Sequence, residues 1–300
     1  MDEEKRIVGG GAVYILLGAM LWGTTGTTQA LAPAEAGPLA VGAVRQGVGG
    51  LVLLLVAVGQ GHLDWRGGWT AAKGASRALW RDTILAGVMM AAYQVLFFSG
   101  VALAGVAVGT IVGIGSVPIA GGVVGWLIRG ERPDGRWLVA TVLALAGCGL
   151  LAAPAEAEVV NGWGLLLAVG AGVAYALYAV FSKGVLAVHT PDGGMALVFL
   201  VGGLFLAPLL LVVDLGWVLT LSGAVVVVHL GVVTVALAYG LFARGLRSVT
   251  VATAMTLTLA EPLTAGLLGV FLLGERLTGR GLVGIGLLIS GLMVLVVKRR

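Results

Sequence analysis

Two charged side chains, Arg45 and Glu261, fall deep inside long apolar stretches of the sequence. A charge at the centre of a lipid bilayer costs at least ~2.5–3.5 kcal/mol, so a charged residue there indicates a function by default. The Glu261 carboxylate could bind a substrate ammonium or a proton, and the planar Arg45 guanidinium could hold a substrate carboxylate. Structural roles stay open for both. Glu261 could satisfy backbone donors or pair with Arg45, and Arg45 could lock helices together or reach the membrane surface.

Two apolar segments each place aromatic and polar side chains on one helical face. At 100° per residue these faces are Gly18, Trp22, Thr25 and Gln29 in the first segment, and Ala171, Tyr175, Tyr178 and Ser182 in the second. A cavity for a small amphipathic solute needs apolar walls with a few polar anchors, and both faces offer that mixture. The alternative is a packing face, with the aromatic rings fitted against small residues of a neighbouring helix.

Three more polar side chains lie at membrane depth: Tyr93, Gln94 and His229. A lone buried histidine is more often a hydrogen-bonded packing residue than a ligand. The predicted substrate-binding set is Trp22, Thr25, Arg45, Tyr93, Gln94, Tyr175, Tyr178, His229 and Glu261. We predict no catalytic residue, metal ligand or cofactor, because the sequence shows no paired acids, HExxH motif or P-loop and its one cysteine excludes a CxxC site.

These residues belong to a chain with the composition of a membrane protein. Hydrophobic residues make up 59% of the 300 and charged residues 11%, whereas about a quarter of the residues of soluble domains are charged. A helix needs about 20 apolar residues to cross ~30 Å of hydrocarbon. Ten segments meet that length: 10–31, 39–60, 82–101, 107–128, 134–153, 163–183, 193–213, 218–243, 249–272 and 278–297. The expected fold is therefore an all-α integral membrane protein with ten transmembrane helices.

The basic residues indicate how these helices are oriented. Of the 18 Lys and Arg residues, only Arg276 and Arg280 fall in predicted outer segments and Arg45 falls within a span. The positive-inside rule then places both termini in the cytoplasm, and we expect a bacterial inner membrane. Loop 61–81, which mixes tryptophans with basic residues, is predicted to lie at the inner lipid headgroups. The sequence pI of 9.5 thus reflects topology and lipid contact, and nucleic acid is not an expected partner.

An internal repeat divides the chain. The stretch RGERPDGR begins at Arg129 and LGERLTGR begins at Leu273, 144 positions later. The same offset pairs the following residues: Pro118 with Pro262, Gly122 with Gly266, and Gly125 with Gly269. The glutamates of the two GER turns are expected to be structural and to lie near the arginines of their own loops.

Each unit has five predicted spans, so the second must be inverted relative to the first, an arrangement typical of transporters with a site near the midplane. The predicted organisation is a cytoplasmic segment 1–9, a first repeat 10–153, an external linker 154–161 and an inverted repeat 162–300.

The order of the motifs resembles the EamA domains of the drug/metabolite transporter superfamily. The resemblance rests on AMLWGTTG, RQGVGGLVLLL, AYQVLFFSGVALAGVAVGTI, AEPLTAGLLGVFLLGERLTG and the two GER turns. It implies ten helices, cytoplasmic termini and alternating access, and it is strongest to bacterial amino-acid exporters, including those for aromatic amino acids. The chain departs from the family at Tyr175, where tryptophan is frequent, and at GIGSVPIAGG, where bulkier residues are usual. Both departures bear on the shape of the cavity.

The leading hypothesis is a secondary transporter, not an enzyme, that exports amino acids or similar small metabolites, with protons as the candidate coupling ion. The alternative within transport is another small solute: a drug, a sugar or a phosphorylated metabolite. Several phosphate charges would call for more cations at membrane depth than Arg45. A membrane-embedded enzyme and a channel or scaffold have less support, and the sequence does not decide between monomer and dimer.

Overall fold

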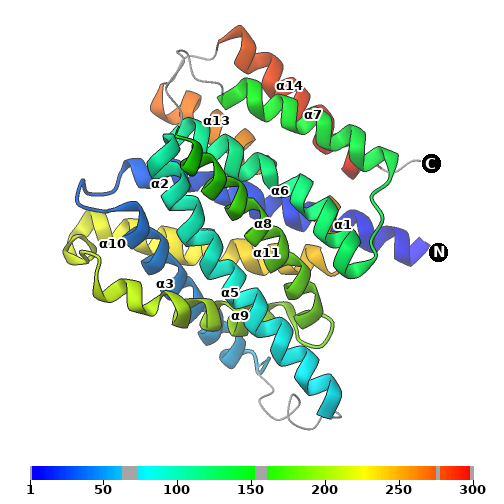
Figure 1. Ribbon diagram of the computed structural model, residues 1–300, viewed down its shortest axis with the longest axis horizontal. Coiled ribbons are helices and arrows are strands. Elements are labelled where there is room, and N and C mark those ends of the chain that lie inside the picture. The colour runs from blue at the N-terminus through cyan, green and yellow to red at the C-terminus, as the bar shows by residue number, and fades with distance from the viewer. Residues whose placement is uncertain (1, 63–72, 153–160, 275–277, 298–300) are drawn as a thin grey trace.

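The computed structural model describes residues 2–62, 73–152, 161–274 and 278–297, and among these residues it is helical with no strand (Figure 1). Eight helical segments are long and apolar enough to cross a membrane, and Gly135–Leu151 is a shorter apolar helix. A multi-helix membrane protein is therefore confirmed, whereas the count of ten spans stays a prediction. Three predicted features lie partly outside the described residues: the linker (154–160), the inner loop (63–72) and the second GER turn (275–276).

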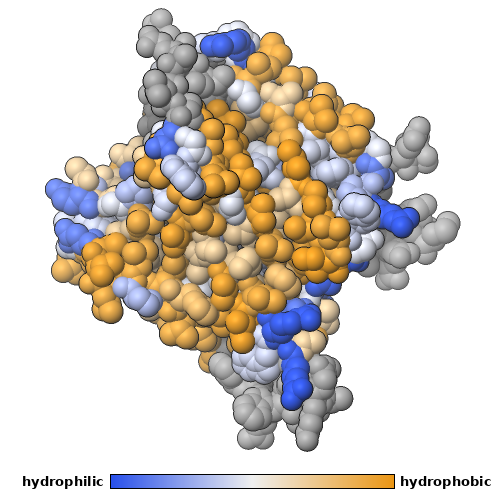
Figure 2. Space-filling model, in the orientation of Figure 1, coloured by the Kyte–Doolittle hydropathy of each residue, from blue (hydrophilic) through white to orange (hydrophobic). Residues whose placement is uncertain are grey.

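The helices are, in chain order, α1 (Asp2–Trp22), α2 (Thr24–Ala30), α3 (Pro38–Gly59), α5 (Lys73–Ala104), α6 (Val106–Arg129), α7 (Gly135–Ala152), α8 (Gly162–Val185), α9 (Pro191–Leu206), η1 (Ala207–Leu211), η2 (Gly216–Leu219), α10 (Leu221–Val228), η3 (His229–Leu237), α11 (Ala238–Leu246), α12 (Val251–Leu257), α13 (Ala260–Leu273) and α14 (Gly279–Val296). The surface between the ends of the bundle is mostly apolar, and polar residues gather at its edges (Figure 2). This distribution is expected for a chain that exposes its sides to lipid.

Close helix packing depends on small residues. At Gly147 on α7, an added Cβ would lie 2.6 Å from the Gly284 carbonyl oxygen of α14, and at Gly291 it would lie 2.6 Å from the Ala140 carbonyl oxygen. Helices in lipid gain little from the hydrophobic effect, so they associate through such backbone contacts. The α7–α14 pair, visible at one edge of Figure 1, is one result. The other closely packed pairs include α5 with α8, α6 with α8, α3 with α9, and α1 with α11.

Three of the ten spans predicted from the sequence are interrupted rather than continuous. The first bends at Gly23, between α1 and α2. The eighth contains the π-helix η3 between α10 and α11, and the ninth is broken between Leu257 and Ala260. Pro262 therefore occupies the first turn of α13, where its missing N–H leaves no intrahelical bond unmade. Pro118, by contrast, lies inside the continuous helix α6.

The repeated GER turns have a local structural cause. Gly130 and Gly274, the glycines of the two turns, follow α6 and α13 with φ of 68° and 71°. A residue with a side chain is strained at such angles, so glycine is the favoured residue for ending a helix in this way. The recurrence of the pattern in both halves thus reflects the same helix ending.

Glu131, in the first GER turn, joins three helices at one end of the bundle. Its Oε1 accepts a hydrogen bond from Lys183 Nζ on α8, and its Oε2 accepts one from the Val251 N–H at the start of α12, at 2.6 Å. The described ion-pair partner of Glu131 is thus Lys183 and not one of the arginines of its own loop. Arg129 instead donates to the Val180 carbonyl oxygen at 2.8 and 3.0 Å. The expectation of a structural role for Glu131 agrees with these contacts.

Replacing Glu131 by glutamine should therefore destabilise the fold. The change removes the charge that pairs with Lys183, and both side chains are mostly buried. We expect a loss of roughly 1–3 kcal/mol, the usual cost of leaving a buried polar group poorly satisfied. Thermal unfolding of the purified protein in detergent measures it, with Glu35→Gln as the control because Glu35 is exposed. Equal melting temperatures for the two variants would contradict the role assigned to Glu131.

Candidate functional site

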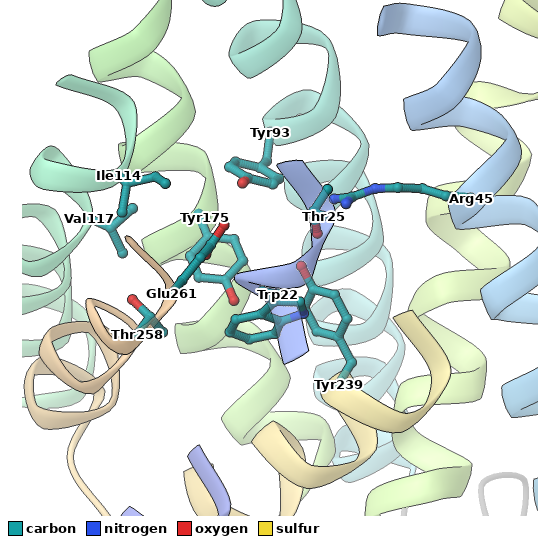
Figure 3. A pocket seen from close by; sticks show the side chains of 10 residues that line it. All are labelled: Trp22, Thr25, Arg45, Tyr93, Ile114, Val117, Tyr175, Tyr239, Thr258 and Glu261. Atoms are coloured by element: carbon teal, nitrogen blue, oxygen red, sulfur yellow. The ribbon is translucent and has the colours of Figure 1, made fainter. Parts of the chain in front are cut away.

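The middle of the bundle contains a small pocket formed by side chains from both halves of the chain (Figure 3). Its lining residues are Trp22, Thr25, Arg45, Tyr93, Ile114, Val117, Tyr175, Tyr239, Thr258 and Glu261. The cavity volume is about 30 Å³, so the side chains close tightly around it. The pocket lies where α1, α2, α3, α5, α6, α8, α11 and α13 meet, with Thr258 in the break before α13.

Arg45 and Glu261 reach into the pocket from opposite sides (Figure 3). Arg45 Nη2 donates a hydrogen bond to Gln94 Oε1 at 3.2 Å, while the buried Arg45 Nε and Gln94 Nε2 have no partner. Among the described residues, neither an ion pair nor a hydrogen bond engages the Glu261 carboxylate. The direct Arg45–Glu261 pair considered from the sequence is therefore not formed. The pocket therefore contains a guanidinium and a carboxyl group that do not pair with each other.

Aromatic rings form the wall between these two charges. The ring centroids of Trp22 and Tyr239 are 4.7 Å apart, and those of Tyr93 and Tyr175 are 4.9 Å apart. Trp22 and Tyr175 meet edge to face at 6.2 Å. The buried Tyr175 hydroxyl has no hydrogen-bond partner. Ring faces of this kind attract cations, and a free hydroxyl can donate to an anion or accept from an ammonium.

The π-helix η3 holds the first membrane segment in place. Trp22 Nε1 donates a hydrogen bond of 2.9 Å to the Thr234 carbonyl oxygen of η3. One residue beyond the Gly23 bend, Thr24 Oγ1 lies 2.9 Å from His229 Nε2. In η3 the Ala238 N–H bonds to Val233, five residues back, and such widened turns occur often at functional sites. Trp22 and α2 are thus both anchored to the same irregular element.

The position of Glu261 depends on two helix breaks that touch. Glu261 lies in the first turn of α13, where the partial positive charge of the helix start favours a carboxylate. Gly23, at the bend after α1, approaches this turn so closely that an added Cβ would lie 2.7 Å from the Glu261 carbonyl oxygen and 2.6 Å from Thr264 Cβ. The absence of a side chain at Gly23 therefore permits the geometry of the site.

The structure brings together six of the residues predicted to bind substrate: Trp22, Thr25, Arg45, Tyr93, Tyr175 and Glu261. Gln94 touches the site through Arg45. Tyr178 lies behind Tyr175, is fully buried, and donates its hydroxyl to Met195 Sδ at 3.3 Å. His229 contacts Thr24 and does not line the pocket. The binding roles of all nine residues stay predictions.

Four lining residues were missed from the sequence: Ile114, Val117, Tyr239 and Thr258. The first two are ordinary apolar residues of a membrane helix and nothing in their pattern distinguishes them. Thr258 lies three residues before Glu261, and Tyr239 falls in the eighth predicted span. The 144-residue repeat pairs Tyr239 with Val95 and Tyr93 with Leu237, so it gave no signal for Tyr239.

Gly23→Ala is expected to disturb the site, whereas Gly26→Ala is not. A methyl group at Gly23 collides with the backbone of Glu261, while at Gly26 nothing lies within 4 Å. Overpacking of this kind typically costs about 1–3 kcal/mol, so Gly23→Ala should lower the melting temperature and reduce transport. Gly26→Ala, in the adjoining helix α2, should leave both unchanged. Equal behaviour of the two variants would show that the close contact at Gly23 does not shape the site.

Fold and pocket together describe a helical membrane protein with a small polar site in its interior, the arrangement of a membrane transporter. The family model for EamA-like transporters matches the chain twice, over residues 9–153 and 162–297, and the chain belongs to this family. The resemblance found in the sequence motifs is thereby confirmed.

Known relatives agree with this assignment. The uncharacterized transporter YwfM of Bacillus subtilis is 43% identical over 260 residues, which cover 87% of this chain and 84% of the relative. An uncharacterized transporter of Archaeoglobus fulgidus is 32% identical over 145 residues, 48% of this chain and 51% of the relative. A solved crystal structure matches with a TM-score of 0.79 over 95% of both chains at 21% identity, which shows the fold alone.

Proposed function

We propose that this membrane transporter exports amino acids, with alternating access and proton coupling. The observation that carries the proposal is an arginine and a glutamate that share one pocket without pairing. Arg45 and Glu261 both line the site, and neither is neutralised by the other. A zwitterion is the class of solute that satisfies both groups at once. Its carboxylate matches the guanidinium and its ammonium matches the carboxylate.

The polar groups around Arg45 favour a carboxylate at that end. Arg45 Nε and Gln94 Nε2 are buried donors without partners, and leaving such donors unsatisfied costs about 1–3 kcal/mol each. A bound carboxylate can accept from both. At the other end, the Glu261 carboxylate and the faces of Tyr93 and Tyr175 offer an ammonium a charge partner and a cation–π surface.

The alternative substrates fit this pocket less well. A phosphorylated metabolite brings two negative charges, but Arg45 is the one cationic side chain among the lining residues. A cationic drug without a carboxylate would leave Arg45 unpaired and would add a second positive charge beside it. A neutral sugar would leave both Arg45 and Glu261 without a counter-charge, which is costly in a low-dielectric site.

Alternating access is supported by the way in which the helices pair. Under the predicted repeat, exchanging the halves converts the α1–α11 contact into the α8–α5 contact and leaves α3–α9 and α7–α14 unchanged, and all four pairs are packed. The glycine contacts follow the same exchange, because Gly147 with Gly284 becomes Gly291 with Ala140. The family model also matches the chain twice. In addition, the start of α1 and the end of α14 lie on the same side of the bundle (Figure 1).

In the proposed orientation, ion pairs close the cytoplasmic end of the bundle. Arg244 of α11 donates to both carboxylate oxygens of Asp192 on α9, at 2.9 and 2.7 Å. Lys183 and Glu131 join α8 to the start of α12 in the same region. Substrate that enters from the cytoplasm requires these contacts to separate, so they act as an inner gate in this conformation.

Proton coupling follows from competition for Glu261. An ammonium binds the ionised carboxylate, whereas a proton neutralises it and removes the attraction. Substrate release to an acidic exterior followed by protonation would return a proton to the cytoplasm for each molecule exported. Efflux should therefore be faster when the outside is acidic than when the two sides have equal pH.

Glu261→Gln tests this role. The amide has the shape of the carboxylate and still forms hydrogen bonds, but it cannot change charge. In proteoliposomes loaded with labelled amino acids, we expect the variant to melt like the wild type and to lose transport by roughly tenfold or more, since one partner of a desolvated charge pair is worth about 2–5 kcal/mol. The remaining flux should be insensitive to a pH gradient. A lower melting temperature with normal flux per folded molecule would instead make Glu261 a structural residue.

The role of Arg45 is tested in the same way with Arg45→Met and with alanine derivatives in which one charged group is blocked. Wild-type protein should exchange alanine but neither alaninamide, which lacks the carboxylate, nor N-acetylalanine, which lacks the ammonium. Arg45→Met removes the partner of the carboxylate, so alanine exchange should fall while the relative rate for alaninamide rises. Equal wild-type exchange of all three compounds would mean that the site does not recognise a zwitterion.

A further inference from the structure

We infer that the site accepts amino acids with small aliphatic side chains, and that Ile114 and Val117 of α6 set the upper limit on side-chain size. The inference rests on the proposed transport of amino acids and adds the class of side chain. It follows from three observations. Packed aromatic rings form much of the pocket wall, two branched apolar side chains line the pocket beside Glu261, and other side chains of the protein fill the space next to the glycines of α6.

The protein's own aromatic rings already occupy the space that an aromatic substrate would need. Trp22, Tyr175 and Tyr239 are each at most 5% exposed, and each packs against another ring of the group. Trp22 is also fixed through its hydrogen bond to the Thr234 carbonyl oxygen. An incoming ring could enter only by displacing one of these side chains.

The apolar wall nearest Glu261 is short and stiff. Ile114 and Val117 line the pocket on the side of Glu261 and Thr258 (Figure 3), and they are 7% and 4% exposed. Branching at Cβ restricts both side chains to few rotamers, so this wall yields little. In an α-amino acid the side chain is attached to the same carbon as the ammonium. An ammonium bound by Glu261 therefore directs the side chain against Ile114 and Val117.

The glycine-rich stretch of α6 does not enlarge the site. An added Cβ would lie 3.1 Å from the Phe97 ring at Gly113, 2.4 Å from Met255 Cγ at Gly121 and 2.6 Å from the Trp137 ring at Gly122. The space left by these glycines is thus filled by other side chains of the protein. The small residues of GIGSVPIAGG, where the family usually has bulkier ones, therefore allow close helix packing. Ile114 and Val117 remain the boundary of the pocket.

Counterflow exchange in proteoliposomes tests the inference with the full-length protein. We expect wild-type protein to exchange alanine and valine with a kcat/KM at least about tenfold above that for leucine or phenylalanine. Val117→Ala and Ile114→Ala should each raise the phenylalanine-to-alanine ratio by about tenfold or more, mainly through KM, since a methylene or two in a tight apolar site is worth 10–200-fold. Val123→Ala is the control, because Val123 is on the same helix and is 49% exposed.

Val117→Ile keeps the test decisive if the alanine variants fold poorly. It adds one methylene, so valine exchange should fall by about tenfold relative to alanine exchange. Wild-type protein that exchanges phenylalanine as well as alanine overturns the inference while amino-acid transport stands, and so do unchanged ratios in variants that melt normally. Folded wild-type protein that exchanges no amino acid overturns the proposed function and the size limit with it.

Discussion

One constraint governs the described structure: a positive and a negative side chain share a membrane-embedded pocket without pairing. Arg45 and Glu261 would attract each other strongly in such a medium, and direct contact would neutralise both. Rigid elements hold them apart. Arg45 extends from α3 and is engaged by Gln94, whereas Glu261 begins α13 on the far side of an aromatic wall. Maintaining this separation requires a well-packed framework around the site.

The irregular helices provide that framework. In a regular helix through residues 249–272, Pro262 would leave the Thr258 carbonyl oxygen without its intrahelical donor. The break before α13 instead creates a helix start beside Glu261, where backbone N–H groups favour a carboxylate. The bend at Gly23 and the π-helix η3 secure the opposite wall through Trp22 and Thr24. Breaks of this kind are tolerated in a membrane where protein or a polar cavity covers the freed backbone groups. In this chain they meet around one pocket.

Much of this site could be predicted from the sequence, because two physical rules that apply to single residues or single helices identify its members. Burying a charge in lipid is so costly that Arg45 and Glu261 stood out without any structure, and the helical period placed Trp22 and Thr25 on one face. Those rules do not reveal which neighbour covers a face. Tyr178 shares the face of Tyr175, yet it is fully buried behind it and bonded to Met195 of α9.

Tyr239 was missed from the sequence, and it follows the π-helix η3 directly. A turn closed over five residues shifts the phase of the helix, so a period of 100° per residue does not extend through η3. Tyr239 lines the pocket, whereas His229, which was predicted to bind substrate, contacts Thr24 and is not among the lining residues. Ile114 and Val117 could not be identified from the sequence, because the same apolar residue types face a cavity and face lipid.

The unpaired side chains also give a physical reason why the proposed transporter would not change conformation without a bound solute. A pocket that moves from one side of the membrane to the other must pass through a state closed on both sides, and Arg45 and Glu261 would then lose water without gaining a partner. The penalty for dehydrating an uncompensated charge is several kcal/mol. A zwitterion removes it by pairing with both groups, and a proton removes part of it by neutralising Glu261. Under the proposed function, the two side chains proposed to recognise the solute would also decide when the proposed inner gate at Asp192 and Arg244 opens, so that recognition and movement would need no separate coupling site.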